Sequence, residues 1–177
     1  MTTLILGASG ATGQLLARQL LNRDQDLKIV VRALDRLPED IRNHDRVSAI
    51  QASVLDLSDA EMIELVGGCR AVASCLGHNL TFKGLFGHPR RLVTDATRRI
   101  CDAVRSSQSG KPGEPVKFLL MNTTGNRNRD LDEPISIAQK CLIGLLRLLL
   151  PPHADNENAA DYLRTKIDQG HPLIEWV

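Results

Sequence analysis

The chain has 177 residues, of which 42% are apolar and 3% aromatic, and its formal net charge at pH 7 is +1. This length and composition suit one α/β domain with a buried core. The balanced charge and the few aromatic side chains are not typical of a nucleic-acid or membrane partner, so we expect neither. The four cysteines lack the spacing of metal ligands or of a disulfide framework, which predicts buried thiols in a cytoplasmic protein and no metal site: Cys69, Cys75, Cys101 and Cys141.

Apolar runs and helical patterns alternate along the chain. We expect strands at 2–6, 27–31, 47–52, 70–76 and 116–121, and a last strand from about 173. We expect helices at 11–22, 58–66, 90–107, 133–149 and 154–168, with a short helical segment near 38–43. Strands that alternate with helices form a doubly wound parallel sheet with right-handed crossovers. The sequence therefore predicts an α/β fold.

Residues 7–13, between the first strand and the first helix, have the spacing GxxGxxG. Gly7 allows a tight turn out of the strand, Gly10 lets the backbone approach a pyrophosphate, and Gly13 lets the helix pack closely on the sheet. The free N–H groups of the helix start and its positive dipole end face the anion. This predicts a dinucleotide site that also includes Ser9, Ala11 and Thr12; the alternative is a glycine-rich turn without a ligand.

The second predicted strand ends in an arginine. In NAD-binding units an acidic residue near this position bonds the ribose 2′-hydroxyl, whereas here the position holds Arg32, with Arg36 close behind. A carboxylate would repel a 2′-phosphate, but a guanidinium binds it bidentately. The sequence thus favours NADP(H) as cofactor, and the alternative for Arg32 is a solvated residue at a strand end.

The glycine motif, the Val30-Val31-Arg32 strand end and the alternating pattern together resemble the short-chain dehydrogenase/reductase superfamily. The likeness is greatest to its atypical NmrA-like and NAD(P)H-binding epimerase-like members. This resemblance implies a Rossmann sheet with strand order 3-2-1-4-5-6 and a cofactor across the carboxyl ends of the strands.

The resemblance also implies positions for further cofactor contacts. Ser53 and Val54 follow the third strand, where the family contacts adenine, and Leu76 and Gly77 follow the fourth strand, beside the nicotinamide ribose. The turn after the fifth strand adds Asn122 and Thr123 to the cofactor site. In the same turn Thr124 matches the hydroxyl that polarises the substrate; its alternative is an ordinary turn threonine.

The superfamily uses a Tyr-x-x-x-Lys pair, which occurs here as Tyr162 and Lys166. In the family most of a helix follows the lysine before the next strand, whereas Lys166 lies close to the last predicted strand. Counting back from that strand places His153 and Glu157 at the family's two positions. We therefore expect His153, with Thr124, as the catalytic group, and keep Tyr162 and Lys166 as the alternative pair.

His78 follows the fourth strand, where a ligand could reach it, and ranks just below His153 as a catalytic histidine. The other histidines are expected on surface loops.

The last residues, 173–177, read as the start of a buried strand. We therefore expect a single domain over 1–177 that is truncated at its sixth strand. The helices at 133–149 and 154–168 are candidates for a homodimer interface.

These observations predict an NADP(H)-binding protein that acts as an atypical reductase on a small carbonyl-type substrate. The alternative is a non-catalytic NADP(H)-sensing regulator of NmrA type with a protein partner. A sugar-nucleotide epimerase ranks last because it needs a working Tyr and Lys.

Overall fold

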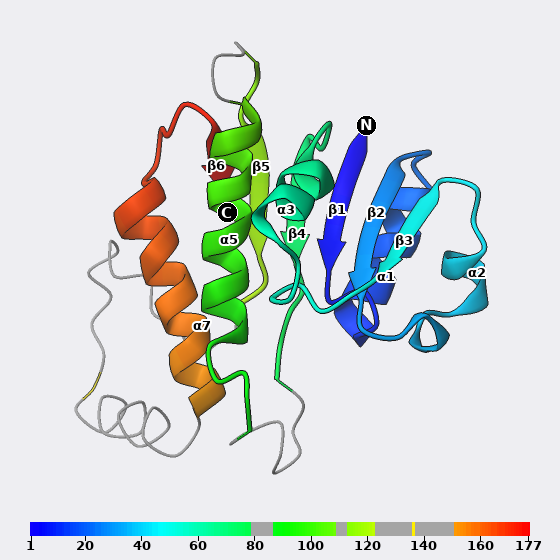
Figure 1. The fold of residues 1–177 in the computed structure, drawn as a ribbon, viewed down its shortest axis with the longest axis horizontal. Coiled ribbons are helices and arrows are strands. Elements are labelled where there is room, and N and C mark those ends of the chain that lie inside the picture. Colours follow the sequence, from blue (N-terminus) through cyan, green and yellow to red (C-terminus); the bar gives the residue numbers. More distant parts are fainter. Residues whose placement is uncertain (79–86, 109–112, 123–135, 137–150) are drawn as a thin grey trace.

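The structure is a computed structural model that describes residues 1–78, 87–108, 113–122, 136 and 151–177. The described strands form one six-stranded parallel sheet with the order β3-β2-β1-β4-β5-β6, which confirms the predicted topology (Figure 1). The strands are β1 (Thr2–Leu6), β2 (Asp26–Val31), β3 (Val47–Gln51), β4 (Ala71–Ser74), β5 (Val116–Leu120) and β6 (Ile174–Trp176).

Helices cover the sheet in two layers. The described helices are α1 (Ala11–Leu21), α2 (Glu39–Arg42), α3 (Asp59–Val66), α5 (Leu92–Gln108) and α7 (Pro151–Tyr162), and two short turns are η1 (Leu34–Arg36) and η2 (Leu163–Ile167). In Figure 1, α3, α5 and α7 lie in front of the sheet and α1 lies behind it. Alternating βαβ units place helices on both faces of a parallel sheet in this way.

Each layer has its own apolar core. On the α1 side, Ile5, Ile29 and Ala17 are buried in one cluster, and Ile41 of α2 joins it. On the other side, α3, α5 and η2 pack on β1, β4, β5 and β6 around the fully buried Phe118. Because apolar side chains cover both faces of the central strands, those strands have no solvated face, as their sequence predicts.

Most predicted element boundaries agree with the structure to within about two residues. The largest difference is at α7, which begins at Pro151 rather than at 154 and changes into the π-helical turn η2 after Tyr162. Proline is well suited to a first helical position, because the N–H group that it lacks would have no partner there. The helix predicted at 133–149 lies outside the described residues, so the homodimer expected through it stays a prediction.

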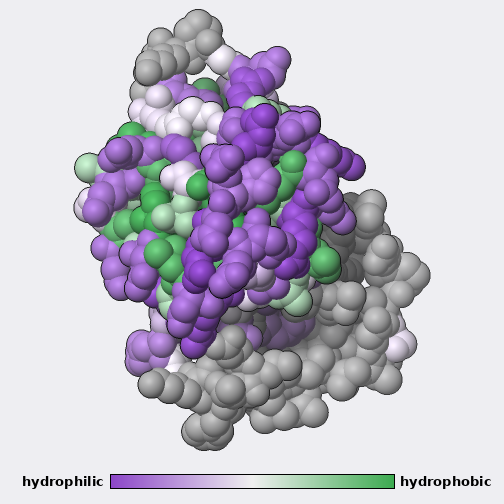
Figure 2. Space-filling model, turned by 90° about the vertical axis from the view of Figure 1, so that its right-hand side faces the viewer, coloured by the Kyte–Doolittle hydropathy of each residue, from purple (hydrophilic) through white to green (hydrophobic). Residues whose placement is uncertain are grey.

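Two further observations concern the surface and the thiols. Among the described residues, no helix is long and apolar enough to cross a membrane. Figure 2 shows the β3 side of the molecule covered mainly by hydrophilic side chains, with apolar ones between them. Cys69, Cys75 and Cys101 are buried free thiols, and burial raises the pKa of Cys101 to about 12, while Cys141 lies outside the described residues.

Candidate cofactor-binding site

The glycine loop has two glycines that the fold requires and one that leaves space. Gly7 has φ +77°, and a Cβ there would lie 2.6 Å from the carbonyl carbon of Cys75. A Cβ on Gly13 would lie 2.8 Å from the Cα of Ala8. A Cβ on Gly10, by contrast, would meet the Gly7 carbonyl oxygen at 3.4 Å, which is ordinary contact. Packing therefore does not require a glycine at position 10, and the missing side chain instead leaves the open side of the loop accessible.

Helix α1 begins at this loop with its positive end uncompensated. Its N-cap is Gly10, which offers no side-chain cap, and its first turn contains no acidic residue. The first N–H groups of a helix have no partner within the helix, and they favour an anion. Ala11 and Thr12 are exposed here, so a phosphate group could reach their backbone amides.

A pocket of about 380 Å³ runs along the carboxyl ends of β1 to β5, with the glycine loop as part of its wall. All predicted cofactor-binding residues up to Gly77 line it: Gly7, Ser9, Gly10, Ala11, Thr12, Gly13, Arg32, Ser53, Val54, Leu76 and Gly77. Asn122 is exposed and is not among the lining residues, and Thr123 lies outside the described residues. The folded chain therefore brings four separate predicted segments to one cavity.

Two arginines stand at the β2 end of this pocket. Arg32 directly follows β2 and Arg36 belongs to η1, and both line the pocket with largely exposed side chains. The neighbouring segment at the end of β3 contributes Ser53 and Val54. A polar wall with two guanidinium groups suits an anionic substituent on the adenosine side of a dinucleotide.

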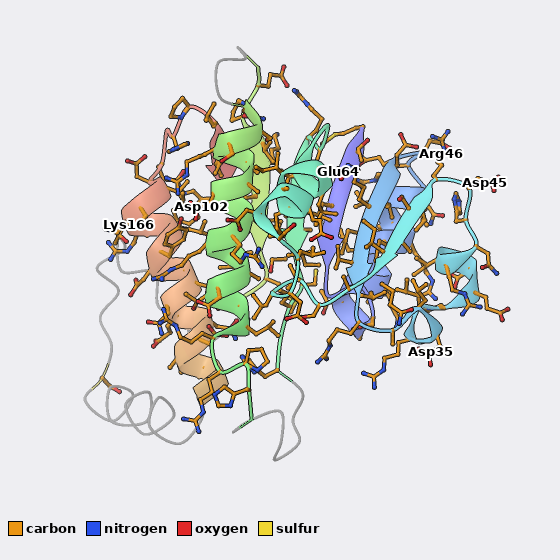
Figure 3. The ribbon with its side chains drawn as sticks, in the orientation of Figure 1. Asp35, Asp45, Arg46, Glu64, Asp102 and Lys166 are labelled. Carbon is orange, nitrogen blue, oxygen red and sulfur yellow. The ribbon has the colours of Figure 1, made fainter. Side chains whose placement is uncertain are left out.

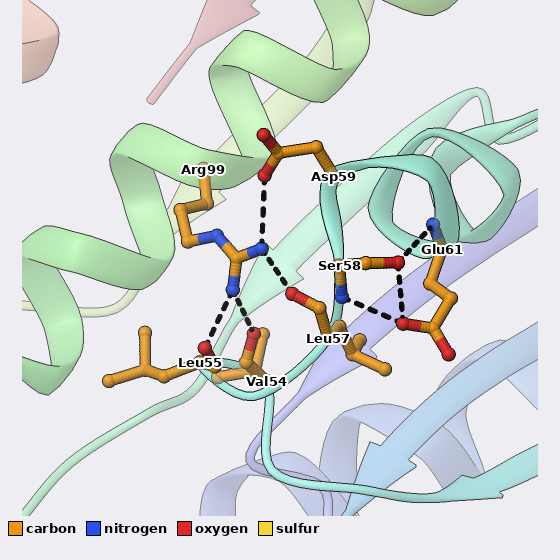
Figure 4. Close-up of polar contacts among 7 residues, drawn as sticks. All are labelled: Val54, Leu55, Leu57, Ser58, Asp59, Glu61 and Arg99. Carbon is orange, nitrogen blue, oxygen red and sulfur yellow. Dashed lines mark hydrogen bonds and ion pairs between the residues drawn. The ribbon is translucent and has the colours of Figure 1, made fainter.

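Arg99 of α5 holds the loop after β3 in place, as Figure 4 shows. Its Nη1 donates to the carbonyl oxygens of Val54 (3.2 Å) and Leu55 (2.8 Å), and its Nη2 donates to that of Leu57 and to Asp59 Oδ1 at 3.2 Å. Sequence reasoning missed this contact, because an arginine within an amphipathic helix has the same pattern as a surface residue.

The loop continues into α3 through a capping box between Ser58 and Glu61. The Ser58 hydroxyl oxygen accepts from the Glu61 amide, and the Glu61 carboxylate accepts from the Ser58 amide at 2.7 Å. The loop after β3 is thus fixed at one end by this cap and along its length by Arg99 (Figure 4).

At the other end of the pocket, His78 meets a buried aspartate. His78 follows β4 and lines the pocket, and its side chain is 6% exposed. Its Nε2 lies 2.9 Å from Oδ2 of Asp155, which comes from the first half of α7 and is 1% exposed. The same carboxylate accepts from the backbone amides of Val93 (2.8 Å) and Thr94 (3.0 Å) and from the Thr94 hydroxyl (2.6 Å).

Asp155 therefore caps the first turn of α5 from another helix and orients His78 at the same time. Burial alone raises the pKa of Asp155, but the hydrogen bonds from His78, Thr94 and the Val93 amide outweigh it and hold the pKa below its usual value. The group is an anion at neutral pH, and its negative charge faces the positive end of the α5 dipole.

The predicted catalytic residues lie elsewhere or outside the described chain. His153 is on α7 but is not among the residues that line this pocket, and its Nε2 lies 3.8 Å from Glu157 Oε1. His153 and Asp155 are two residues apart, so their side chains leave the helix in directions that differ by about 200°. Thr124 lies outside the described residues, so its role and that of His153 stay predictions.

Tyr162 and Lys166 line a different groove, between α5 and the end of α7. Arg105 Nη2 donates to the Tyr162 hydroxyl at 3.2 Å, and burial raises the pKa of this tyrosine. Figure 3 shows Lys166 on the outer side of the helix pair, whereas Asp35 projects near the carboxyl ends of the strands. A crossover helix starts at the carboxyl edge of the sheet and returns to its amino edge, so residues late in α7 lie away from the pocket.

Comparison with known proteins identifies the class. The NAD(P)H-binding domain family matches residues 7–134, which is more than half of the chain, so the protein belongs to this family. The resemblance to the short-chain dehydrogenase/reductase superfamily is thereby confirmed. No curated protein sequence matches the chain significantly.

Solved structures support the fold. The chain is similar to the oxidoreductase ylbE from Lactococcus lactis, with 18% identity and a TM-score of 0.63 over 94% of this chain and 64% of that one. A short-chain dehydrogenase/reductase from Veillonella parvula has 21% identity and a TM-score of 0.61, over 93% and 63% of the two chains. The enzyme WbmH from Bordetella bronchiseptica, in complex with NAD+, has 16% identity and a TM-score of 0.62, over 92% and 51%. The chain thus spans between half and two thirds of these proteins.

Proposed function

We propose that the protein binds NADP(H) in the pocket along the sheet edge and reduces a small carbonyl-type substrate there. The observation that carries the cofactor choice is the position of Arg32, which lines the pocket directly after β2. The glycine loop and the free end of α1 suit the pyrophosphate, and the loop that Arg99 holds suits the adenine side. When bound, the nicotinamide supplies or takes up a hydride.

A non-catalytic NADP(H) sensor is the second candidate, and one observation favours it. Tyr162 packs against α5, and burial raises its pKa, whereas a tyrosine that exchanges protons in this superfamily needs a lowered pKa. The two candidates differ in one measurement. A reductase oxidises NADPH when quinones, aldehydes or ketones are supplied, and a sensor binds NADPH without oxidising it with any of them.

The cofactor choice is tested by titrating NADPH and NADH calorimetrically into wild type and R32A. We expect wild type to bind NADPH more tightly, and R32A to lose about tenfold or more in NADPH affinity, because a charge-assisted bidentate contact contributes roughly 1.5–3 kcal/mol. The NADH affinity of R32A should change little.

The matched control is R23A, because Arg23 is an exposed arginine outside the pocket. It should bind NADPH like wild type. Equal affinities of the wild-type protein for the two cofactors would contradict the assignment of Arg32.

A further inference from the structure

The His78 end of the pocket holds the elements of a proton-transfer site. The pocket extends from Arg32, at the end of β2, across the glycine loop to His78 and Met121, at the ends of β4 and β5. A dinucleotide whose adenosine side lies at Arg32 has its reactive end on the β4 side, because β4 and β2 flank β1 on opposite sides. His78 is therefore the histidine that the pocket presents, among the described residues, to the reactive end.

We propose that His78, held in position by Asp155, exchanges a proton with a carbonyl or alcohol substrate in this pocket. This assignment rests on the proposed oxidoreductase function and adds a residue to it. His78 is the catalytic group, and Asp155 is a positioning residue that acts through the imidazole ring.

The geometry determines which nitrogen of His78 can react. Asp155 is an anion and accepts hydrogen bonds only, so the facing Nε2 of His78 carries a hydrogen in both protonation states. Nδ1 has no hydrogen-bond partner among the described residues. It can therefore accept a proton when the ring is neutral and donate one when the ring is charged.

In a reduction, the carbonyl carbon gains a hydride and the carbonyl oxygen gains a proton. A reduced nicotinamide bound in this pocket would supply the hydride that the carbonyl carbon takes up, and the carbonyl π pair would move to oxygen. The imidazolium of His78 gives its Nδ1 proton to that oxygen, so an alcohol and a neutral imidazole result. Water then returns a proton to the ring.

Among the described residues, α7 contacts His78 directly, and the start of α5 is bonded to the same carboxylate of Asp155. From α7, Asp155 faces the ring directly, while His153 and Glu157 lie near each other at 3.8 Å. From the start of α5, Asp95 is on the same helical turn as Thr94 and lies 3.9 Å from Arg91. Within the part of the chain that the structure describes, Asp155 is the ionised group that contacts the ring.

The test compares two forms of one cofactor. NADP+ carries a positive nicotinamide ring and NADPH a neutral one, whereas their adenosine sides are identical. A titrating group beside the nicotinamide therefore releases more protons when NADP+ binds than when NADPH binds. Calorimetric titrations of the full chain, in buffers of different ionisation enthalpy near pH 6.5, measure the protons released in each case.

We expect wild type to release more protons with NADP+ than with NADPH, and H78Q to lose this difference. The glutamine amide can still donate to Asp155 but does not titrate. The control H44Q should keep the difference, because His44 is exposed on the loop before β3 and outside the pocket. R32A should weaken both cofactors' binding and also keep the difference.

Several outcomes would overturn the assignment. They are the same difference in H78Q as in wild type, no difference in wild type, or a difference that H153Q removes and H78Q retains. If H78Q does not fold, nitrogen NMR spectra of wild type provide the same test, because one histidine ring with a fixed Nε2–H must change its protonation between the two complexes. Absence of binding by either cofactor would contradict the proposed function itself, whereas normal binding with an unchanged difference contradicts His78 alone.

Discussion

The two ends of the pocket are built in different ways. At the Arg32 end, the pocket is lined by one contiguous stretch of main chain, within residues 7–13, and by an arginine that follows the next strand. At the His78 end, hydrogen bonds join side chains 77 positions apart in the case of His78 and Asp155, and 61 apart in the case of Thr94 and Asp155. One end is thus a local backbone structure, and the other depends on how three elements pack.

This difference determines what a substitution does at each end. A backbone site is disturbed mainly by added atoms, because its N–H donors belong to the main chain and every substitution except one by proline keeps them. A buried side-chain site is disturbed by removed atoms, because each lost acceptor leaves buried donors without a partner. Substitutions at the His78 end should therefore act on stability first, and those on the open side of the glycine loop should act on binding first.

The largest effect is expected for D155A. It leaves the Val93 and Thr94 amides and the Thr94 hydroxyl without their acceptor and removes the partner of His78. Breaking a buried charged network of this kind costs about 3–5 kcal/mol, which urea unfolding at pH 7 would measure. The control D95A, at the same end of α5 but 44% exposed, should lose less than about 1 kcal/mol.

The difference in stability between wild type and D155A should depend on pH. The pKa of Asp155 is held below its usual value, so its contribution is present above the unfolded-state pKa of about 3.9 and is lost as pH falls through the lower folded-state pKa. The stability gap between wild type and D155A should therefore narrow in acid. A gap that stays constant or widens below about pH 4 would show that the carboxylate is not the stabilising form.

The division between local and long-range contacts also explains what the sequence could predict. The alternating strands and helices and the glycine loop follow from periodicity and from glycine spacing, which depend on near neighbours in the chain. The strand order is implied by the resemblance to a known family. The position of Arg32 in the pocket follows from the strand that precedes it, because parallel strands end at a common edge.

Asp155 and Arg99 carry no comparable signal. Reasoning by register selected His153 and Glu157, which share one side of α7, whereas the residue that contacts His78 is Asp155, about half a turn around the helix. Arg99 binds carbonyl groups, which every residue has, so no partner side chain identifies it in the sequence. Contacts of this kind depend on packing geometry, which single-sequence patterns do not contain.

The glycine loop offers a second, smaller test of the comparison. G7A places a Cβ against the Cys75 carbonyl at a residue with φ +77°, and G13A places one against Ala8. Each variant should lose about 1–3 kcal/mol in the free energy of unfolding. For G13A this loss occurs although alanine normally stabilises a helix relative to glycine. G10V, on the open side of the loop, should keep a native circular dichroism spectrum and lose NADPH binding.

The control for added bulk is G113V, because a Cβ at Gly113 meets no atom within 4 Å and lies on the turn before β5. It should change neither stability nor cofactor binding appreciably. If G10V binds NADPH normally, the glycine loop is not the pyrophosphate site, and the proposed position of the cofactor is wrong.

Arg99 lies between the two kinds of construction, and its substitution should weaken NADPH binding less than G10V does. It is a side chain on α5 that acts on backbone, the carbonyl groups of Val54, Leu55 and Leu57. R99A should lose about 1–3 kcal/mol of stability, because charge-assisted hydrogen bonds to a partly buried loop disappear. It should also weaken NADPH binding severalfold, since the loop carries Ser53 and Val54 into the pocket. R99K separates charge from shape: lysine keeps the charge but cannot span the carbonyl groups with a planar fork, so it should restore little of either loss.

R46A is the control, because Arg46 is 43% exposed and its pairs with Asp24 and Asp26 lie on the surface, where they contribute about 0–1 kcal/mol. Equal losses in R99A and R46A, measured by urea unfolding and by NADPH titration, would mean that Arg99 is an ordinary surface residue and that the loop after β3 holds its shape without it.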